Sequence, residues 1–299
     1  MPNDKLKNYL HLHFLVFIAG FTAILGELIT ISAIPLVWYR MIIALVLIFI
    51  YIKIAKIKIN IPKTDVVKLS LAGIIIALHW ITFFASIEVS NISIALSMFS
   101  TGAFFASIIE PLVFKRKIIG YEIIFGLLVI LGVIIITQSE LKHLNGILLG
   151  IVSAFLSALF AVLNGKFLKK FTATTISFYE FLSGILFISI LMFVFGYGYS
   201  STIFHLPKSD ITYLLLLGSI CTAYAFIAAV HVMHYISPYT VMLTYNLEPV
   251  YGIILALLFF PENEQMSPTF YYGAAIILFS VLVNGILKNK KQMVKRKSS

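Results

Sequence analysis

The sequence predicts an all-α, polytopic membrane protein with ten transmembrane helices in two inverted five-helix repeats. Three observations indicate this fold class: the composition, a series of long apolar runs, and a similarity between the two halves of the chain. Of the 299 residues, 61% are hydrophobic and only 11% are charged, whereas soluble domains carry about 25% charged residues. Together with a mean hydropathy of +1.03, this composition excludes a soluble globular protein and a disordered chain.

The expected helices are apolar runs that end at charged residues, Gly or Pro. Most of these runs have the ~17–25 residues that cross a bilayer. Because they do not alternate between apolar and polar residues, they exclude a β-barrel. The expected spans are Leu10–Ile29, Ile34–Ile52, Val67–Ile87, Ile92–Phe114, Tyr121–Thr137, Gly146–Asn164, Ile176–Phe195, Tyr213–Met233, Thr240–Phe260 and Tyr271–Leu287.

The positions of the basic residues predict the orientation in the membrane. If the N-terminus is cytoplasmic, every Lys and Arg falls in a cytoplasmic segment except Arg40, Lys142 and Lys208. Such an excess follows the positive-inside rule. We therefore expect a multi-pass protein of the cell (plasma) membrane with both termini cytoplasmic and a basic tail over residues 288–299. This distribution, with a weak attraction to anionic lipids, explains the net charge of +10 without a nucleic-acid partner.

The two halves of the chain resemble each other in order. Trp38–Arg40 opens the second expected helix as Phe178–Glu180 opens the seventh, and Leu71–Gly73 corresponds to Leu216–Gly218. Because each half holds an odd number of helices, the second copy must be inverted relative to the first. Inverted repeats are typical of secondary transporters, whose substrate site lies near the bilayer midplane between the repeats.

A spacing of small residues on the expected sixth helix points to close helix packing. Gly146, Gly150, Ala154 and Ala158 recur every four residues, and this spacing lets two helices approach closely. Packing within the bundle is favoured over contact with a second copy of the chain. The spacing does not fix the oligomeric state, and a monomer and a homodimer both stay open.

The chain resembles the EamA-type branch of the drug/metabolite transporter superfamily. The residues that carry the resemblance are Arg40 after Pro35, the segment Thr82–Ile87 ahead of Ser93–Leu96, and Glu248-Pro249 followed by Glu262 and Gly273. The first half departs from the pattern, because Gly102 replaces a proline and Lys115–Lys117 replace an acidic residue. The resemblance implies five-helix repeats over residues 10–137 and 146–287 and transport of a small metabolite across the membrane.

Polar residues within the apolar runs are the candidate site, because ionisable groups in a membrane are costly and usually face the bundle interior or water. Glu248 lies well inside the ninth expected helix, next to Pro249, which cannot donate a hydrogen bond to the preceding turn. His79 and Tyr224 occupy equivalent places in the two repeats, as do Thr101 and Glu248. The expected substrate-binding residues are His79, Trp80, Thr101, Tyr224, Tyr245 and Glu248.

Three further charged residues are expected to act in structure or in coupling. Arg40 and Glu27 lie on either side of a short turn, so we expect a buried ion pair, with an anion contact by Arg40 as the alternative. Glu180 is the repeat equivalent of Arg40 and is expected within reach of the loop Lys166–Lys170. Structural and transport roles for Glu180 stay equally open. Pro249, which disrupts the local helix hydrogen bonds, is likewise expected to act in structure or coupling.

The sequence favours a secondary transporter that exports a small metabolite, such as an amino acid or another amphipathic solute, by alternating access. The alternatives are an intramembrane enzyme and a channel or receptor. No His-Glu-x-x-His, Gly-x-Ser-x-Gly or phosphate-loop motif occurs, so an enzyme is disfavoured. We expect no catalytic residues, cofactor or metal; proton coupling through Glu248 is an open alternative.

Overall fold

In the part of the chain that it describes, the computed structural model consists of helices joined by turns and short irregular connections, without strands. That part comprises residues 2–115, 120–196, 204–232, 235, 244–245 and 247–297. Its helices are α1 (Pro2–Leu28), α2 (Ala33–Ile54), α3 (Lys63–Val89), α4 (Ile92–Phe99), α5 (Gly102–Phe114), α6 (Gly120–Ser139), the 3₁₀ turn η1 (Leu141–His143), α7 (Leu144–Phe167), α8 (Ala173–Val194), α10 (Lys208–Gly218), the π-helical segment η3 (Ser219–Tyr224), α11 (Ala225–Val232), α13 (Glu248–Phe259) and α14 (Pro268–Lys297).

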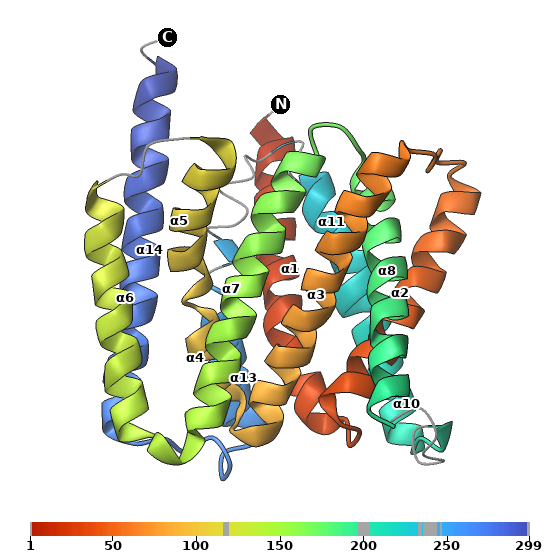
Figure 1. The fold of residues 1–299 in the computed structure, drawn as a ribbon. Helices are drawn as coiled ribbons and strands as arrows, with labels where there is room; N and C mark the ends of the chain where they lie inside the picture. Colours follow the sequence, from red (N-terminus) through yellow and green to blue (C-terminus); the bar gives the residue numbers. More distant parts are fainter. Residues whose placement is uncertain are drawn as a thin grey trace.

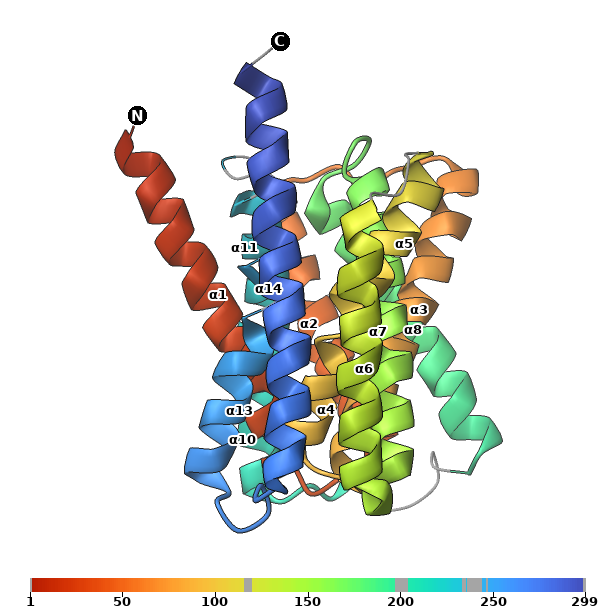
Figure 2. The ribbon, with the colours of Figure 1, turned by 90° about the vertical axis from the view of Figure 1, so that its left-hand side faces the viewer.

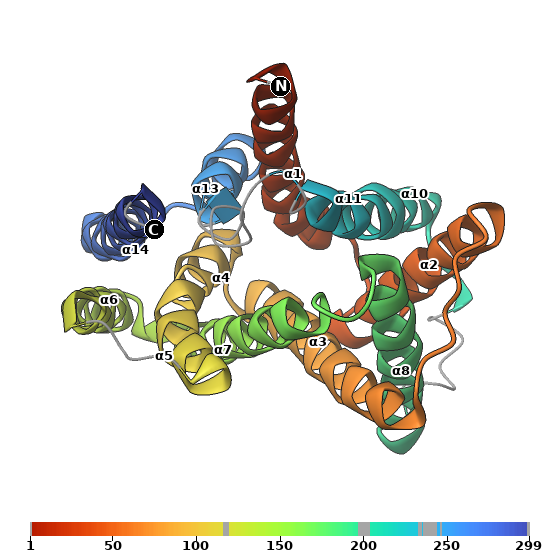
Figure 3. The ribbon, with the colours of Figure 1, turned by 90° about the horizontal axis from the view of Figure 1, so that it is seen from above.

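The helices run roughly parallel to one long direction of the molecule, and both termini lie at the same end (Figure 1). We call this the terminal end, and the other the opposite end. Helix α1 starts at the terminal end, whereas α7 starts at the opposite end. Viewed along the bundle, α6 and α14 form a pair at one edge (Figure 3). From the side, α1 leans away from the other helices toward its N-terminus (Figure 2).

Seven helical segments of the described chain are long and apolar enough to cross a membrane. They are Leu6–Leu28, Ala33–Ile54, Lys63–Val89, Ile92–Phe114, Leu141–Phe167, Ala173–Val194 and Lys208–Ala229. Three apolar helices are shorter: Ile124–Ser139, Glu248–Phe259 and Pro268–Asn284. Large apolar side chains such as Leu112, Phe193 and Tyr272 are also strongly exposed on the helix surfaces, which suits a surrounding hydrocarbon solvent. The protein is a multi-pass membrane protein.

The four-residue spacing on the sixth expected helix is confirmed as packing inside the bundle. Gly146, Gly150, Ala154 and Ala158 are all buried on α7. A Cβ atom at Gly146 would clash with Ser90, and one at Gly150 would lie 2.7 Å from the Cβ of Met98. The Ser86 hydroxyl also donates a 2.7 Å hydrogen bond to the Gly146 carbonyl oxygen. The small residues therefore bring α7 against α3 and α4 rather than presenting a face to a second copy.

The helices differ from the sequence expectation in three places. The expected fourth span is broken at Ser100 and Thr101, which separate α4 from α5. The expected eighth span contains the π-helical segment η3. Of the expected ninth span, residues 240–243 and 246 lie outside the described residues, and α13 begins only at Glu248. Apolar periodicity cannot locate such breaks, because the runs stay apolar through them.

The basic tail also differs from expectation, because α14 continues to Lys297 instead of ending near Leu287. Lys, Arg, Gln and Met all favour helical backbone, so this segment extends the helix beyond its apolar part (Figure 2).

Candidate functional site

Arg40 is the central cation of the site, and it is only 4% exposed. Its Nε donates a 2.6 Å hydrogen bond to Oγ1 of Thr222 on η3. The Arg40 guanidinium carbon lies 4.2 Å from the ring centroid of Trp80, where the negative face of the indole attracts a cation. Its Nη1 is buried without a hydrogen-bond partner. Arg40 is thus held on one side and leaves a donor unused on the other.

The expected ion pair between Arg40 and Glu27 is wrong. No ion pair joins these two described side chains, and the polar contact of Arg40 is with Thr222 instead. Thr222 can take this place because η3 is π-helical: its hydroxyl donates to the carbonyl oxygen of Leu217, five residues earlier, at 2.7 Å. Its oxygen then accepts from Arg40. Sequence reasoning missed Thr222, since nothing in the apolar run marks the irregular turn, a feature that is frequent at functional sites.

His79 lies on α3, next to the Trp80 ring that Arg40 contacts, and is 5% exposed. Its Nδ1 lies 3.0 Å from the carbonyl oxygen of Ser153 on α7, and the Ser153 hydroxyl donates to the His79 carbonyl oxygen at 3.2 Å. Because a carbonyl oxygen only accepts, Nδ1 carries the proton in this arrangement. Nε2 is then an acceptor, and it makes no hydrogen bond to a described residue.

Aromatic rings connect His79 to Arg40. The His79 ring stacks on Phe99 at 5.5 Å and lies 5.5 Å from Phe160. Trp80 is buried against Phe181 at 5.6 Å, so it faces the interior and not the lipid. We call Trp80, Phe83, Phe99, Phe160 and Phe181 the aromatic cluster. Such a wall binds the apolar part of a small molecule, while few polar groups orient it.

Glu248 lies at the start of a helix, and Thr101 lies at a break between two helices. Glu248 is the first residue of α13, and Pro249 follows in the first turn, where its missing N–H would be unpaired in any case. Thr101 lies between α4 and α5, and its hydroxyl donates to the Met98 carbonyl oxygen at 2.7 Å. Thr101 is 2% exposed and satisfied by its own turn. The sequence predicted that Thr101 and Glu248 are equivalent; Thr101 separates α4 from α5, and Glu248 begins α13. Interrupted helices are typical of transporter binding sites.

Glu248 is the central anion of the site. It lies deep in the protein, where Arg40 and Tyr245 are its electrostatic neighbours, yet its side chain is not fully covered. Its carboxylate makes no hydrogen bond or ion pair with any residue that the structure describes. The structure shows no hydrogen bond or ion pair between the Arg40 guanidinium group and the Glu248 carboxyl group.

Tyr224 does not join this centre. It is 43% exposed, and its hydroxyl lies 2.7 Å from Nε2 of His11 on α1. The expected convergence of Tyr224 with His79 is wrong, because the π-helical turn of η3 directs Thr222 inward and Tyr224 toward α1. Tyr245 packs with Leu247 and Tyr251 against a buried cluster of α1 and α11, next to Glu248.

Glu27 borders a separate cavity near the opposite end. This cavity has a volume of about 270 Å³ and is also lined by Thr30, Ser32, Phe84 and Glu88. The Phe84 ring centroid lies 5.6 Å from the Arg40 guanidinium carbon. Phe84 therefore separates the cavity at the opposite end from the central cation.

Glu180 lies outside the central group, in the contact of α8 with α3 and α7. It is 0% exposed and accepts a 3.3 Å hydrogen bond from Nδ2 of Asn164. The expected reach to the loop Lys166–Lys170 is not seen: of those lysines, Lys170 pairs with Asp65.

Sequence reasoning missed a set of carboxylates at the opposite end. Asp210 accepts from Thr30, Glu264 accepts from the backbone N–H groups of Ile92 and Ser93, and Glu140 accepts from that of Ser267. Each contact joins segments far apart in the chain. The only available signal was an acidic residue near an expected helix end, which is too common to be diagnostic.

Among the residues that the structure describes, no cluster of three or more His, Cys, Asp or Glu side chains could hold a metal ion. The candidate site therefore consists of the cation Arg40, the anion Glu248, the acceptor on His79 and the aromatic cluster. This composition can bind a small molecule that carries both charges and an apolar part.

Comparisons with known proteins identify the family and a similar fold. A family model described as the EamA-like transporter family matches residues 7–138 and again residues 144–286. A solved structure titled "Crystal structure of protein" has a TM-score of 0.66 at 12% identity, over 95% of this chain and 98% of that one; it is similar in fold. The search of curated proteins gives no match.

Proposed function

The chain belongs to the EamA-like transporter family, and from this premise we propose that it is a secondary transporter of a small zwitterionic metabolite of the amino-acid class. Transport proceeds by alternating access, with ten membrane helices in two inverted repeats. We propose export as the direction, the plasma membrane as the location and the cytoplasm as the side of both termini. The small-molecule substrate and the lipid bilayer are the proposed partners.

The observation that carries the proposal is the separation of Arg40 from Glu248. Two opposite charges in a membrane interior would gain most from a direct ion pair, yet these two make none, and Nη1 of Arg40 has no partner. A zwitterion supplies the missing partners, because its carboxylate can bind Arg40 and its ammonium group can bind Glu248. The aromatic cluster would then hold an apolar side chain.

Two features support alternating access. The fourth expected span of the first matched segment is interrupted at Ser100 and Thr101, and such discontinuous helices are typical of transporters that work by alternating access. The ring of Phe84 stands between Arg40 and the cavity lined by Glu27, which makes it a suitable gate toward the opposite end.

Counterflow in proteoliposomes tests the proposal. We expect labelled amino acids with apolar side chains to enter vesicles preloaded with the unlabelled compound, and analogues that lack either charge to compete weakly. Glu248→Gln removes one charge-assisted contact, which is worth roughly 1.5–3 kcal/mol, so affinity should fall about ten- to a hundred-fold.

Glu262→Gln is the matched control, because Glu262 is an exposed acid of the following loop. If Glu248 instead carries a coupling proton, Glu248→Gln keeps counterflow and loses transport driven by a pH gradient. Unchanged affinity and unchanged gradient-driven transport in Glu248→Gln would refute both roles. Absence of counterflow with amino acids, nucleosides and cationic drugs alike would refute the transporter itself.

A further inference from the structure

Glu180 is a fully buried acid that the proposed transport site does not use. It lies seven residues after the start of α8, about 10 Å along the helix axis at ~1.5 Å per residue. No part of its side chain is exposed. An ionised carboxylate in such a position requires a cation or several hydrogen-bond donors, because burial removes the water that would otherwise stabilise its charge.

The surroundings of Glu180 supply neither. Its Oε2 accepts a single hydrogen bond, from Nδ2 of Asn164 at 3.3 Å, and its Oε1 has no partner. The hydroxyls three residues away on either side donate to backbone carbonyl oxygens instead: Ser177 to Ala173 at 2.8 Å, and Ser183 to Tyr179 and Glu180 at 2.8 and 3.1 Å.

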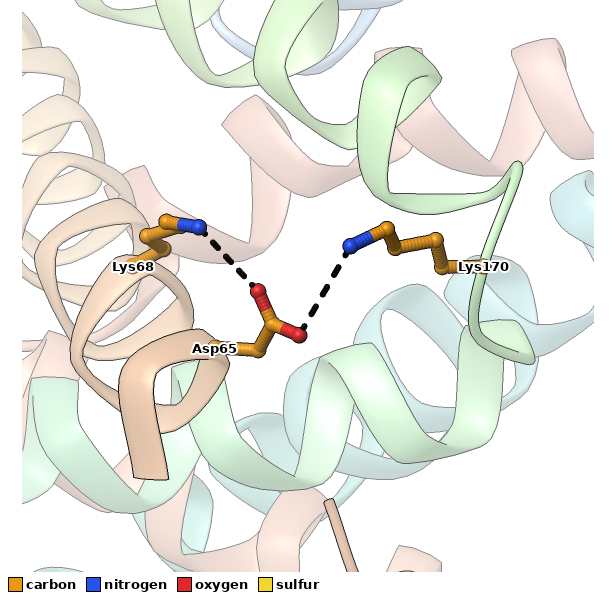
Figure 4. A network of polar contacts seen from close by, with 3 residues as sticks. All are labelled: Asp65, Lys68 and Lys170. Atoms are coloured by element: carbon orange, nitrogen blue, oxygen red, sulfur yellow. Dashed lines mark hydrogen bonds and ion pairs between the residues drawn. The ribbon is translucent and has the colours of Figure 1, made fainter. Parts of the chain in front are cut away.

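None of the ion pairs or hydrogen bonds of the charged residues on the helices that pack on α8 involves the Glu180 carboxyl group in the described part of the chain. Arg40 of α2 bonds to Thr222. At the terminal end of α3, Asp65 pairs with Lys68 and with Lys170 from the segment after α7 (Figure 4). On the face of α3 that meets α8, Gly73 lies so close that a Cβ atom would clash with the Glu180 carbonyl oxygen. Asn164 is therefore the polar neighbour of the Glu180 carboxyl group.

Asn164 also lacks a hydrogen-bond donor to one of its side-chain atoms. Its Oδ1 is buried and has no partner. Oδ1 of Asn164 and Oε1 of an ionised Glu180 are both acceptors only, so two neighbouring side chains each lack one donor. A single proton on the carboxyl group turns this arrangement into an acid–amide pair in which each group donates once and accepts once. The result is the same if the amide is rotated by 180°, because its oxygen then faces the carboxyl group and again requires a proton.

We propose that Glu180 is a proton-binding site, separate from the transport site, that holds one proton between its carboxyl group and Asn164 in the conformer described here. The site lies where α7 and α8 of the second matched segment meet α3 of the first. Relative movement of the two segments would change the surroundings of the proton. Its occupancy needs no substrate, so this inference stands or falls independently of the zwitterion binding described above.

Infrared spectroscopy of the purified protein in lipid vesicles tests the proposal with the proton itself as the probe. At neutral pH, the difference spectrum of wild type minus Glu180→Gln should contain the carbonyl stretching band of a protonated carboxyl group. Glu180→Gln is the matched variant, because a Gln amide can donate to Asn164 Oδ1 and accept from its Nδ2. Its melting temperature should therefore equal that of the wild type. Glu248→Gln should leave the band in place.

Asn164→Leu provides a second, independent measurement. Removal of the amide should shift the frequency of the carboxyl band, because the hydrogen bonds of the acid are lost. If the difference spectrum shows the bands of an ionised carboxylate instead, or if Asn164→Leu leaves the carboxyl band unshifted, the proposal is overturned. Should Glu180→Gln fail to fold, the shift in Asn164→Leu alone decides between these results.

Discussion

Different kinds of polar contact stabilise the two ends of the bundle. At the opposite end, Asp210, Glu264 and Glu140 are at most 4% exposed and accept hydrogen bonds from backbone N–H groups at 2.8–3.1 Å. At the terminal end, Asp65 pairs with Lys170 at 3.9 Å, and the lysine side chain is 67% exposed (Figure 4). Hydrogen bonds to a charged group contribute roughly 1.5–3 kcal/mol, whereas exposed ion pairs contribute about 0.2–1 kcal/mol.

This difference indicates which end opens first. The buried contacts at the opposite end join segments that belong to different matched repeats, since Asp210 binds Thr30 and Glu264 binds the start of α4. Separation of the halves there would leave carboxylates and N–H groups without partners. Separation at the terminal end breaks only a solvent-screened pair. We therefore expect the terminal end to separate more readily than the opposite end, and the three predictions below test that asymmetry.

Loss of the Glu264 carboxylate should have the largest effect. Its two oxygens accept from the N–H groups of Ile92 and Ser93 at 2.9 and 2.8 Å, at the N-terminus of α4, where a negative charge is favourable. Glu264→Ala leaves both donors buried, so the free energy of unfolding should fall by about 2–4 kcal/mol. Thermal unfolding in detergent measures this loss. Glu262 in the same loop is exposed, so Glu262→Ala should leave the free energy of unfolding unchanged. Equal losses of stability in the two variants would show that the Glu264 contact does not stabilise the opposite end.

Weakening of the Asp210 contact should have an intermediate effect. Oδ2 of Asp210 accepts from the N–H and the hydroxyl of Thr30 at 3.1 and 2.7 Å. Asp210→Asn keeps an acceptor but loses its charge, so stability should fall by about 1–2 kcal/mol and the opposite end should open more often. Ser32 borders the cavity at this end. In a Cys221→Ser background, a cysteine introduced by Ser32→Cys should therefore react faster with an impermeant thiol reagent in intact cells when Asp210→Asn is present.

Ser209, the exposed residue that precedes Asp210, offers the control for this labelling experiment. Ser209→Ala should leave the labelling rate of Ser32→Cys unchanged. A rate that Asp210→Asn does not raise would argue against a closed opposite end. Labelling only after the cells are opened would place this end in the cytoplasm and reverse the proposed orientation.

Removal of the exposed pair should have the smallest effect. Lys170→Gln eliminates the contact with Asp65 and should change the free energy of unfolding by less than about 1 kcal/mol, with a difference that vanishes at high salt. Lys166→Gln, an exposed lysine of the same region, is the matched control in the same thermal assay. A loss as large as that of Glu264→Ala would mean that both ends are fastened equally and would remove the asymmetry.

The sequence by itself determined the class of the molecule and the chemical types at its centre. Apolar runs too long for soluble helices require a bilayer, and small residues on one face, such as Gly146 and Gly150, require a close neighbour; both are local properties. The expectation that Arg40, His79 and Glu248 lie in the interior follows in the same way, because a charged or polar group in an apolar run must avoid lipid.

Only the tertiary structure decided which groups meet. Arg40 lies next to Glu27 in the sequence pattern, yet it bonds to Thr222, 182 positions away, and Tyr224 bonds to His11 across 213 positions. These partners depend on the rotation and tilt of each helix and on irregular turns such as η3, which arise from packing between distant segments. Apolar runs look the same at every rotation about the helix axis, so the sequence places Arg40 in the interior but does not specify its partner.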